Sequence, residues 1–196
     1  MSRAGQKRTG LSVFESSYHS CQKHFAINFG EDVGKSAKTI PASDTGTERF
    51  WEDTPLSEMT TAQWESLCDG CGRCCLNKVE DWDTGEIIWT DLACRLLDHD
   101  SCRCMDYPNR LAKVPECLQL TPETVGELSW LPPSCAYARL RDGKPLLWWH
   151  PLVSGDADTV HAAGISVRGR IKTEIGVPLE EYEEHLVSWP VTDNGK

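Results

Sequence analysis

Long apolar runs are absent from this chain of 196 residues. Residues 1–20 lack the apolar core of a signal peptide, and no stretch approaches the roughly 18 apolar residues of a membrane span. Glu15, Glu31 and Asp32 argue against an organellar transit peptide, because such peptides are poor in acidic residues. We therefore expect a protein of the reducing cytoplasm without a membrane partner, where thiols stay reduced unless a metal holds them.

Positive charge is also scarce. The chain has 20 Lys and Arg against 30 Asp and Glu, which gives a formal net charge of -10. Proteins bind nucleic acids through clustered Lys and Arg, so this balance argues against a nucleic-acid partner. No Cys pair is followed by the His pair of a DNA-binding zinc finger. If the chain has a macromolecular partner, we expect a protein.

The common sequence signatures of enzymes are missing too. There is no Gly-rich phosphate loop, nucleophile elbow or metalloprotease histidine motif, and an enzymatic role stays open on this ground. Apolar residues make up 39% of the chain, which predicts a modest core. Eight tryptophans can bury large areas, and a metal that joins distant cysteines would add folding free energy.

Cysteine is what the chain has in quantity. It holds ten cysteines, and Cys21 is the only one outside residues 68–135. Four of them share one run, Cys68-Asp69-Gly70-Cys71-Gly72-Arg73-Cys74-Cys75. The glycines let the backbone curl so that successive thiolates converge. In a reducing compartment this concentration favours metal binding over disulfides.

The spacing Cys68-x2-Cys71-x2-Cys74 matches the first three ligands of a bacterial ferredoxin run, but the fourth cysteine and its proline are missing. Cys75 follows directly instead. Adjacent side chains tend to point apart, so we expect Cys74 and Cys75 to serve different metal sites, or one of them to pack. The predicted metal ligands are Cys68, Cys71, Cys74, Cys75, Cys94, Cys102, Cys104 and Cys117. Eight thiols suffice for two four-coordinate zinc sites, or for one iron–sulfur cluster with thiols left over.

Three further positions bear on the ligand set. A Cys102-x-Cys104 pair in a strand would direct both thiols to one face, which suits chelation. Cys135 fits ligation and packing equally well. His150 precedes Pro151 and is expected to cap a turn rather than bind metal. A thioredoxin-like dithiol is disfavoured, because the C-x-x-C motif here follows a helix instead of opening one.

The chain divides into three parts by composition. Residues 1–48 mix Ser, Gly and Lys without a sustained period, which predicts a disordered N-terminal extension with Cys21 as a free thiol. Residues 49–190 form the predicted metal-binding domain, and residues 191–196 a C-terminal tail. We expect a small, irregular α+β fold of short helices and few short strands, stapled by metal.

Local patterns predict several elements of this domain. Thr60 should cap a helix with Gln63 at the capping-box position, and that helix delivers Cys68 to the cluster. A strand over 86–89 should follow a turn at Asp83-Thr84-Gly85 and lead to Cys94. The other expected elements are a helix over 134–140, a strand over 165–167, and a helix over 178–187 with Leu179, Tyr182 and Leu186 on one face.

The segment from Trp64 through Cys75 resembles the YcgN-like cysteine-cluster proteins, a bacterial group described as zinc- or iron-chelating. The resemblance spans roughly residues 50–190. It continues through Ala93-Cys94-Arg95, Cys102-x-Cys104, Pro115-Glu116-Cys117, Trp130-Leu131-Pro132, Ser134-Cys135-Ala136-Tyr137, Trp149-His150-Pro151-Leu152 and Ile165-Ser166-Val167-Arg168. It implies metal chelation by the eight cysteines named above, with Cys135 as a weaker addition and Tyr107, Trp149 and His150 near the site. It implies no particular reaction.

Three functions remain open from the sequence. The first is a protein that chelates zinc or iron, as ions or as an iron–sulfur cluster, through the cysteine cluster. The second is an iron–sulfur redox or catalytic protein. The third is a structural zinc module that mediates contacts with a protein partner.

Overall fold

The computed structural model describes residues 11–13 and 49–189. They form the mixed α+β fold that the sequence predicts, with short helices and one small sheet. Most of the predicted extension over residues 1–48, including Cys21, and the predicted tail over 191–196 lie outside the described residues. Within the extension, Leu11–Val13 is described and forms strand β1.

The sheet has the strand order β1-β2-β3-β4. Antiparallel pairing joins β1 to β2 (Leu76–Asp81) and β2 to β3 (Ile87–Ala93), and the short β4 (Lys172–Thr173) runs parallel to β3. The predicted turn between β2 and β3 is present, because Asp81 Oδ1 accepts hydrogen bonds from the backbone N–H groups of Asp83 and Thr84. The strand predicted over 86–89 is confirmed as the first half of β3, which ends directly before Cys94.

Outside the sheet, the described residues include six α-helices of four to six residues together with 3-10 helices and loops: α1 (Phe50–Asp53), α2 (Thr61–Ser66), α3 (Arg110–Lys113), α4 (Ala136–Arg141), α5 (Pro151–Ser154) and α6 (Thr159–Ala162). Helices this short are not stable alone. The predicted capping box at the start of α2 is confirmed: Gln63 N–H donates to Thr60 Oγ1, and Thr60 N–H donates to Gln63 Oε1. It fixes the helix that leads into Cys68.

Three local predictions need correction. The helix expected over 134–140 begins at Ala136 with Cys135 as its N-cap, and the Ser134 hydroxyl instead accepts from the Arg73 guanidinium at 3.5 Å. Residues 165–167 form a buried loop instead of a strand. The final segment is a 3-10 helix (Leu179–His185) that ends before Leu186, so the three predicted positions do not share one helix face. Tyr182 is buried, whereas Leu179 is 58% exposed.

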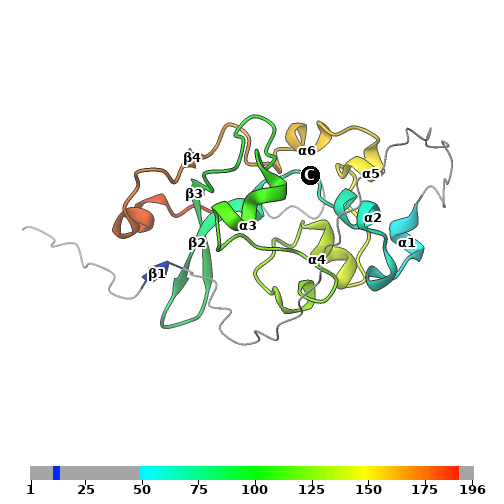
Figure 1. Cartoon of the computed structure of the whole chain (residues 1–196), viewed down its shortest axis with the longest axis horizontal. Coiled ribbons are helices and arrows are strands. Elements are labelled where there is room, and N and C mark those ends of the chain that lie inside the picture. Colours follow the sequence, from blue (N-terminus) through cyan, green and yellow to red (C-terminus); the bar gives the residue numbers. More distant parts are fainter. Residues whose placement is uncertain (1–10, 14–48, 190–196) are drawn as a thin grey trace, which may run out of the picture.

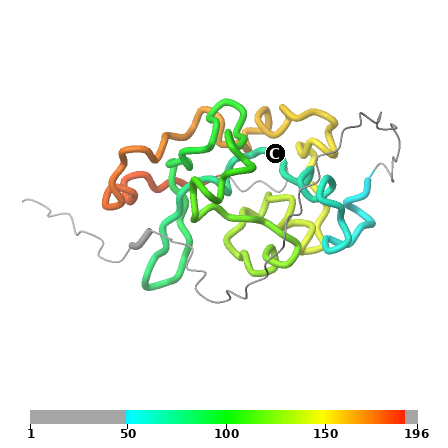
Figure 2. Tube along the Cα trace, in the orientation of Figure 1, coloured from blue at the N-terminus to red at the C-terminus, as the bar shows by residue number. Residues whose placement is uncertain are grey.

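The core is divided into four separate clusters of buried side chains. The largest joins α1, α2 and α4, where Tyr137 Oη donates to the Trp64 carbonyl and Trp64 Nε1 donates to the Leu120 carbonyl. In Figure 1 these helices and α5 lie at one end of the molecule, and the sheet with the 3-10 helix lies at the other. Figure 2 shows that irregular chain makes up much of what lies between them.

Gly72 provides a test of how tightly the central segment is packed. Its φ is +75°, and a Cβ there would lie 2.7 Å from Val167 Cγ2 and 3.3 Å from Cys102 Cβ. Gly72→Ala should therefore destabilise the protein twice over: about 1 to 2 kcal/mol for the left-handed conformation, and about 1 to 3 kcal/mol for overpacking. The free energy of unfolding of variant and wild type, measured in urea, gives this loss of stability.

Gly143→Ala is the matched control. Gly143 has φ +66°, and a Cβ there would meet no atom beyond its chain neighbours within 4 Å, so its variant should show the conformational cost alone. Equal losses in the two variants would contradict the packing of Gly72 against Val167.

Candidate metal centre

One cavity of about 340 Å³ gathers every cysteine that the structure describes. Its wall includes all eight predicted ligands together with Cys135, namely Cys68, Cys71, Cys74, Cys75, Cys94, Cys102, Cys104, Cys117 and Cys135. Residues of α2, α4 and the 3-10 helix before α3 also line it, including Trp64, Tyr137 and Tyr107. The chain thus brings thiols from sequence positions 68 to 135 to one place.

The strand pairing explains how distant cysteines meet. The segment Cys68–Cys75 runs from the end of α2 to the start of β2, and Cys94 follows β3. Because β2 and β3 pair antiparallel, Cys94 N–H donates to the Cys75 carbonyl at 2.9 Å. Val167 N–H likewise donates to the Cys71 carbonyl at 2.8 Å, so the 165–167 loop supports the motif from another side.

Cys74 and Cys75 do not point apart, contrary to the expectation from their adjacency. They belong to a 3-10 helix (Arg73–Cys75), and their sulfur atoms are 4.0 Å apart. Two thiolates bound to one tetrahedral zinc at 2.3 Å would stand about 3.8 Å apart. The two neighbours are therefore spaced as ligands of a single ion would be.

The Cys102-x-Cys104 pair is not part of a regular strand either. Cys102 has φ +55° and is buried among Leu97 and Val167, while Cys104 forms an isolated bridge with Leu97. The prediction that both thiols point to one face of a strand therefore fails. Burial raises the pKa of the Cys102 thiol, and the charge of Arg168 opposes this effect.

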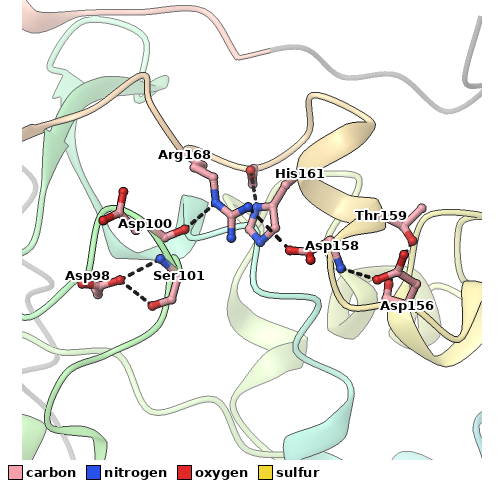
Figure 3. A network of polar contacts seen from close by, with 9 residues as sticks. Asp98, Asp100, Ser101, Asp156, Asp158, Thr159, His161 and Arg168 are labelled. Atoms are coloured by element: carbon pink, nitrogen blue, oxygen red, sulfur yellow. Dashed lines mark hydrogen bonds and ion pairs between the residues drawn. The ribbon is translucent and has the colours of Figure 1, made fainter.

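A polar network holds the loop that carries Cys102 and Cys104 (Figure 3). Asp98 Oδ1 accepts from both the backbone N–H and the hydroxyl of Ser101. Arg168 donates to the Asp100 carbonyl and lies 3.5 Å from Asp158 just before α6. Arg168 thus ties this loop to the segment around α6.

Burial dominates the electrostatics of the thiols. Burial raises the pKa of Cys68 to about 12 and that of Cys135 to about 12, with a further increase from the nearby Cys74 thiolate in each case. Burial, Asp69 and Cys74 raise the pKa of Cys71 well above its ordinary value. The contact with Cys75, followed by burial, does the same for Cys74. These thiols hold their protons without metal, so metal binding must release protons.

The effects of the thiols on one another's pKa values divide most of them into two groups. Cys68, Cys71 and Cys135 each interact with Cys74. A second group consists of Cys94, Cys104 and Cys117, because Cys117 and Cys104 both raise the pKa of Cys94. Cys74 also raises the pKa of Cys117, which links the groups.

Cations stand close to several of these thiols. Arg103 lowers the pKa of Cys68 and Arg110 lowers that of Cys117, each against the larger effect of burial. Arg73 is 1% exposed, and its Nε donates to the Ile165 carbonyl at 2.9 Å. Burial lowers the pKa of Lys78 to about 8, and the thiolates of Cys74 and Cys75 oppose that shift. No local motif in the sequence marks these cations, because their surroundings come from distant segments.

His150 caps α5, as predicted. Its Nδ1 accepts from Leu152 N–H at 3.1 Å, and its Nε2 lies 3.0 Å from the Leu67 carbonyl, to which it donates. Both ring nitrogens are thus engaged in holding the chain beside Cys68. Within residues 11–13 and 49–189, no three His, Cys, Asp or Glu side chains are arranged to hold a metal ion as they stand. Binding therefore requires thiols of the cavity to converge.

Comparison with known proteins identifies the family. A UPF0260 protein of Sinorhizobium fredii is 63% identical over 146 residues, which are 74% of this chain and 94% of the relative. This chain belongs to the UPF0260 family. A further UPF0260 protein, from Agrobacterium fabrum, is 60% identical over 143 residues, 73% of this chain and 88% of the relative. That of Rhodopseudomonas palustris is 60% identical over 142 residues, 72% of this chain and 84% of the relative.

The cysteine-rich part of this UPF0260 chain also matches a family model. Residues 67–136 match the CxxCxxCC family, described as "Putative zinc- or iron-chelating domain". This confirms the resemblance drawn from the cysteine pattern, and the matched range includes all nine cysteines of the cavity. No solved structure gives a significant match. None of the helices in the described part of the chain has the length and apolarity to cross a membrane.

The contacts of His150 lead to a prediction with a defined pH dependence. His150→Gln should cost about 1 to 2 kcal/mol of stability at pH 7.5, because it disrupts two buried hydrogen bonds. Burial lowers the pKa of His150 below its ordinary value, so the unfolded chain takes up the proton first as the pH falls. The wild type loses this stability below about pH 6.5, and the difference between wild type and variant should shrink toward pH 5.5.

Denaturant unfolding at several pH values measures this difference. Metal content should be equal in wild type and His150→Gln at pH 7.5. A lower metal content in His150→Gln than in wild type would instead indicate that His150 is a ligand.

Proposed function

We propose that this chain is a cytoplasmic metal-binding protein that holds zinc or iron in the thiol-lined cavity, without nucleic acid or membrane as partner. The observation that carries this proposal is the convergence of nine cysteines on one cavity. Thiolates are the donors that zinc and iron–sulfur clusters prefer, and buried thiols gain stability when a metal replaces their protons.

We favour an iron–sulfur cluster as the form of this centre. The nine thiols of the cavity exceed the four that a mononuclear zinc site uses. When bound, an iron–sulfur cluster supplies one-electron transfer, and an iron without a full thiolate set supplies a site for substrate.

The grouping of the thiols suggests how they would share the metal. Cys68, Cys71, Cys74 and Cys135 form the first candidate ligand set, since three of them each interact with Cys74. The second candidate set is Cys94, Cys104 and Cys117, with Cys75 beside Cys74 between the two. In this arrangement the β2–β3 pairing and α4 position both sets of thiols. The apolar lining from Trp64 and Tyr137 limits the access of water to them.

A structural zinc module that mediates partner contacts is the second candidate. The 4.0 Å between the Cys74 and Cys75 sulfurs favours it, because this separation suits two ligands of one tetrahedral zinc. A site of that kind is closed, and its contribution is folding free energy rather than chemistry.

Elemental analysis distinguishes the two candidates. The protein is purified without oxygen from cells that were supplied with both iron and zinc, and iron, zinc and acid-labile sulfide are measured with a visible spectrum. The iron–sulfur proposal expects iron with sulfide and a brown colour. Stoichiometric zinc without colour would select the structural zinc module, and protein without either metal would refute both.

Cys71→Ser tests whether the motif holds the metal. Cys71 is 8% exposed, lines the cavity and interacts with Cys74, so its loss should reduce both metal content and thermal stability. Cys21→Ser is the control, since we expect no role for that thiol in the centre. Unchanged metal content and melting temperature in Cys71→Ser would remove this residue from the ligand set.

A further inference from the structure

A lysine is buried beside the backbone that follows the cysteine motif. Lys78 on β2 is 8% exposed, and its Nζ donates to the carbonyl oxygens of Cys74 at 3.1 Å and Leu76 at 2.7 Å. Two tryptophan rings flank the same nitrogen, with the centroid of Trp89 at 4.6 Å and that of Trp130 at 4.4 Å. These two rings also contact each other edge to face, with their centroids 6.2 Å apart.

No carboxylate balances this charge within the described ranges. The ion pairs found there involve other cations, and Lys78 contacts only carbonyl groups and aromatic faces. Removing an ammonium from water costs several kcal/mol, which carbonyl dipoles and ring faces offset only in part. Lys78 is instead tied to Cys74 through its carbonyl, and negative charge on Cys74 and Cys75 raises the pKa of Lys78 against the larger effect of burial.

We propose that Lys78 is the charge-compensating residue of the metal centre: its buried ammonium, fixed between Trp89 and Trp130, offsets the negative charge that Cys74 and Cys75 bring to the metal-bound state. This inference rests on the proposed function. A zinc ion with four thiolates, or a cysteine-ligated iron–sulfur cluster, keeps a net negative charge. That charge is costly in a dry cavity unless a cation stands nearby.

The placement of Lys78 suits this role more than a structural one. Its Nζ is tied to the carbonyl of Cys74, a candidate ligand, so the cation keeps a fixed position relative to the site. The rings of Trp89 and Trp130 lie close to the same nitrogen.

Lys78→Met separates the two roles, because methionine keeps the length and packs well against aromatic rings but carries no charge. Zinc is the probe, and its affinity is measured by competition with a chromophoric chelator. Lys78→Met should bind zinc roughly 10- to 100-fold more weakly than wild type, the range typical for loss of an outer-shell partner. Lys78→Arg should restore most of the affinity. Lys144→Met, which removes an exposed lysine, should leave it unchanged.

Unfolding of the metal-free and zinc-loaded forms gives a second readout. Metal-free Lys78→Met should be as stable as the metal-free wild type or more so, because a buried charge has been removed. The zinc-loaded variant should be less stable than the loaded wild type. Should Lys78→Met not fold, Lys78→Gln carries the same comparison.

Two results would overturn the proposal. One is zinc affinity in Lys78→Met equal to that of wild type. The other is an equal loss of stability by the metal-free and the zinc-loaded forms of Lys78→Met. That result would mean that Lys78 only stabilises the fold through its hydrogen bonds to two carbonyls. Wild type that binds neither zinc nor iron through thiolates would refute the proposed function itself, and the role of Lys78 with it.

Discussion

Nine thiols around one largely apolar cavity are the constraint on which the rest of this structure depends. Burial raises the pKa of several of them, to about 12 for Cys68 and Cys135. The cavity thus favours neutral thiols without metal, and a metal must supply the free energy that removes their protons. Arg73 within the cysteine motif and Lys78 just after it are buried, and positive charge there would lower the cost of negative charge on the thiols.

The division of the core gives the cavity its structural importance. The helical end around Trp64 and Tyr137 and the sheet around Val79 and Leu92 belong to separate clusters. The segments that carry the cysteines lie between these two ends, where the chain is mostly irregular. A metal centre at that place would join the two ends in the way a larger core does in other proteins of this size.

The parts of the fold that local chemistry decides could be predicted. The capping box at Thr60 and Gln63 and the turn before β3 each depend on neighbouring residues, and the number of cysteines identifies the candidate site. Features set by tertiary contacts could not be predicted. The 3-10 helix that brings the Cys74 and Cys75 sulfurs together is one, and the left-handed conformation of Cys102 is another. The position of Lys78 depends on tryptophans 11 and 52 residues away in sequence, which no local pattern reveals.

X-ray absorption spectroscopy at the metal edge of the protein as isolated tests the central claim most directly. The account predicts a first coordination shell of sulfur alone, at about 2.3 Å if the metal is zinc, and a metal–metal scattering path if the centre is polynuclear. A first shell made mainly of oxygen or nitrogen would contradict the claim that the cysteine cavity is the metal site.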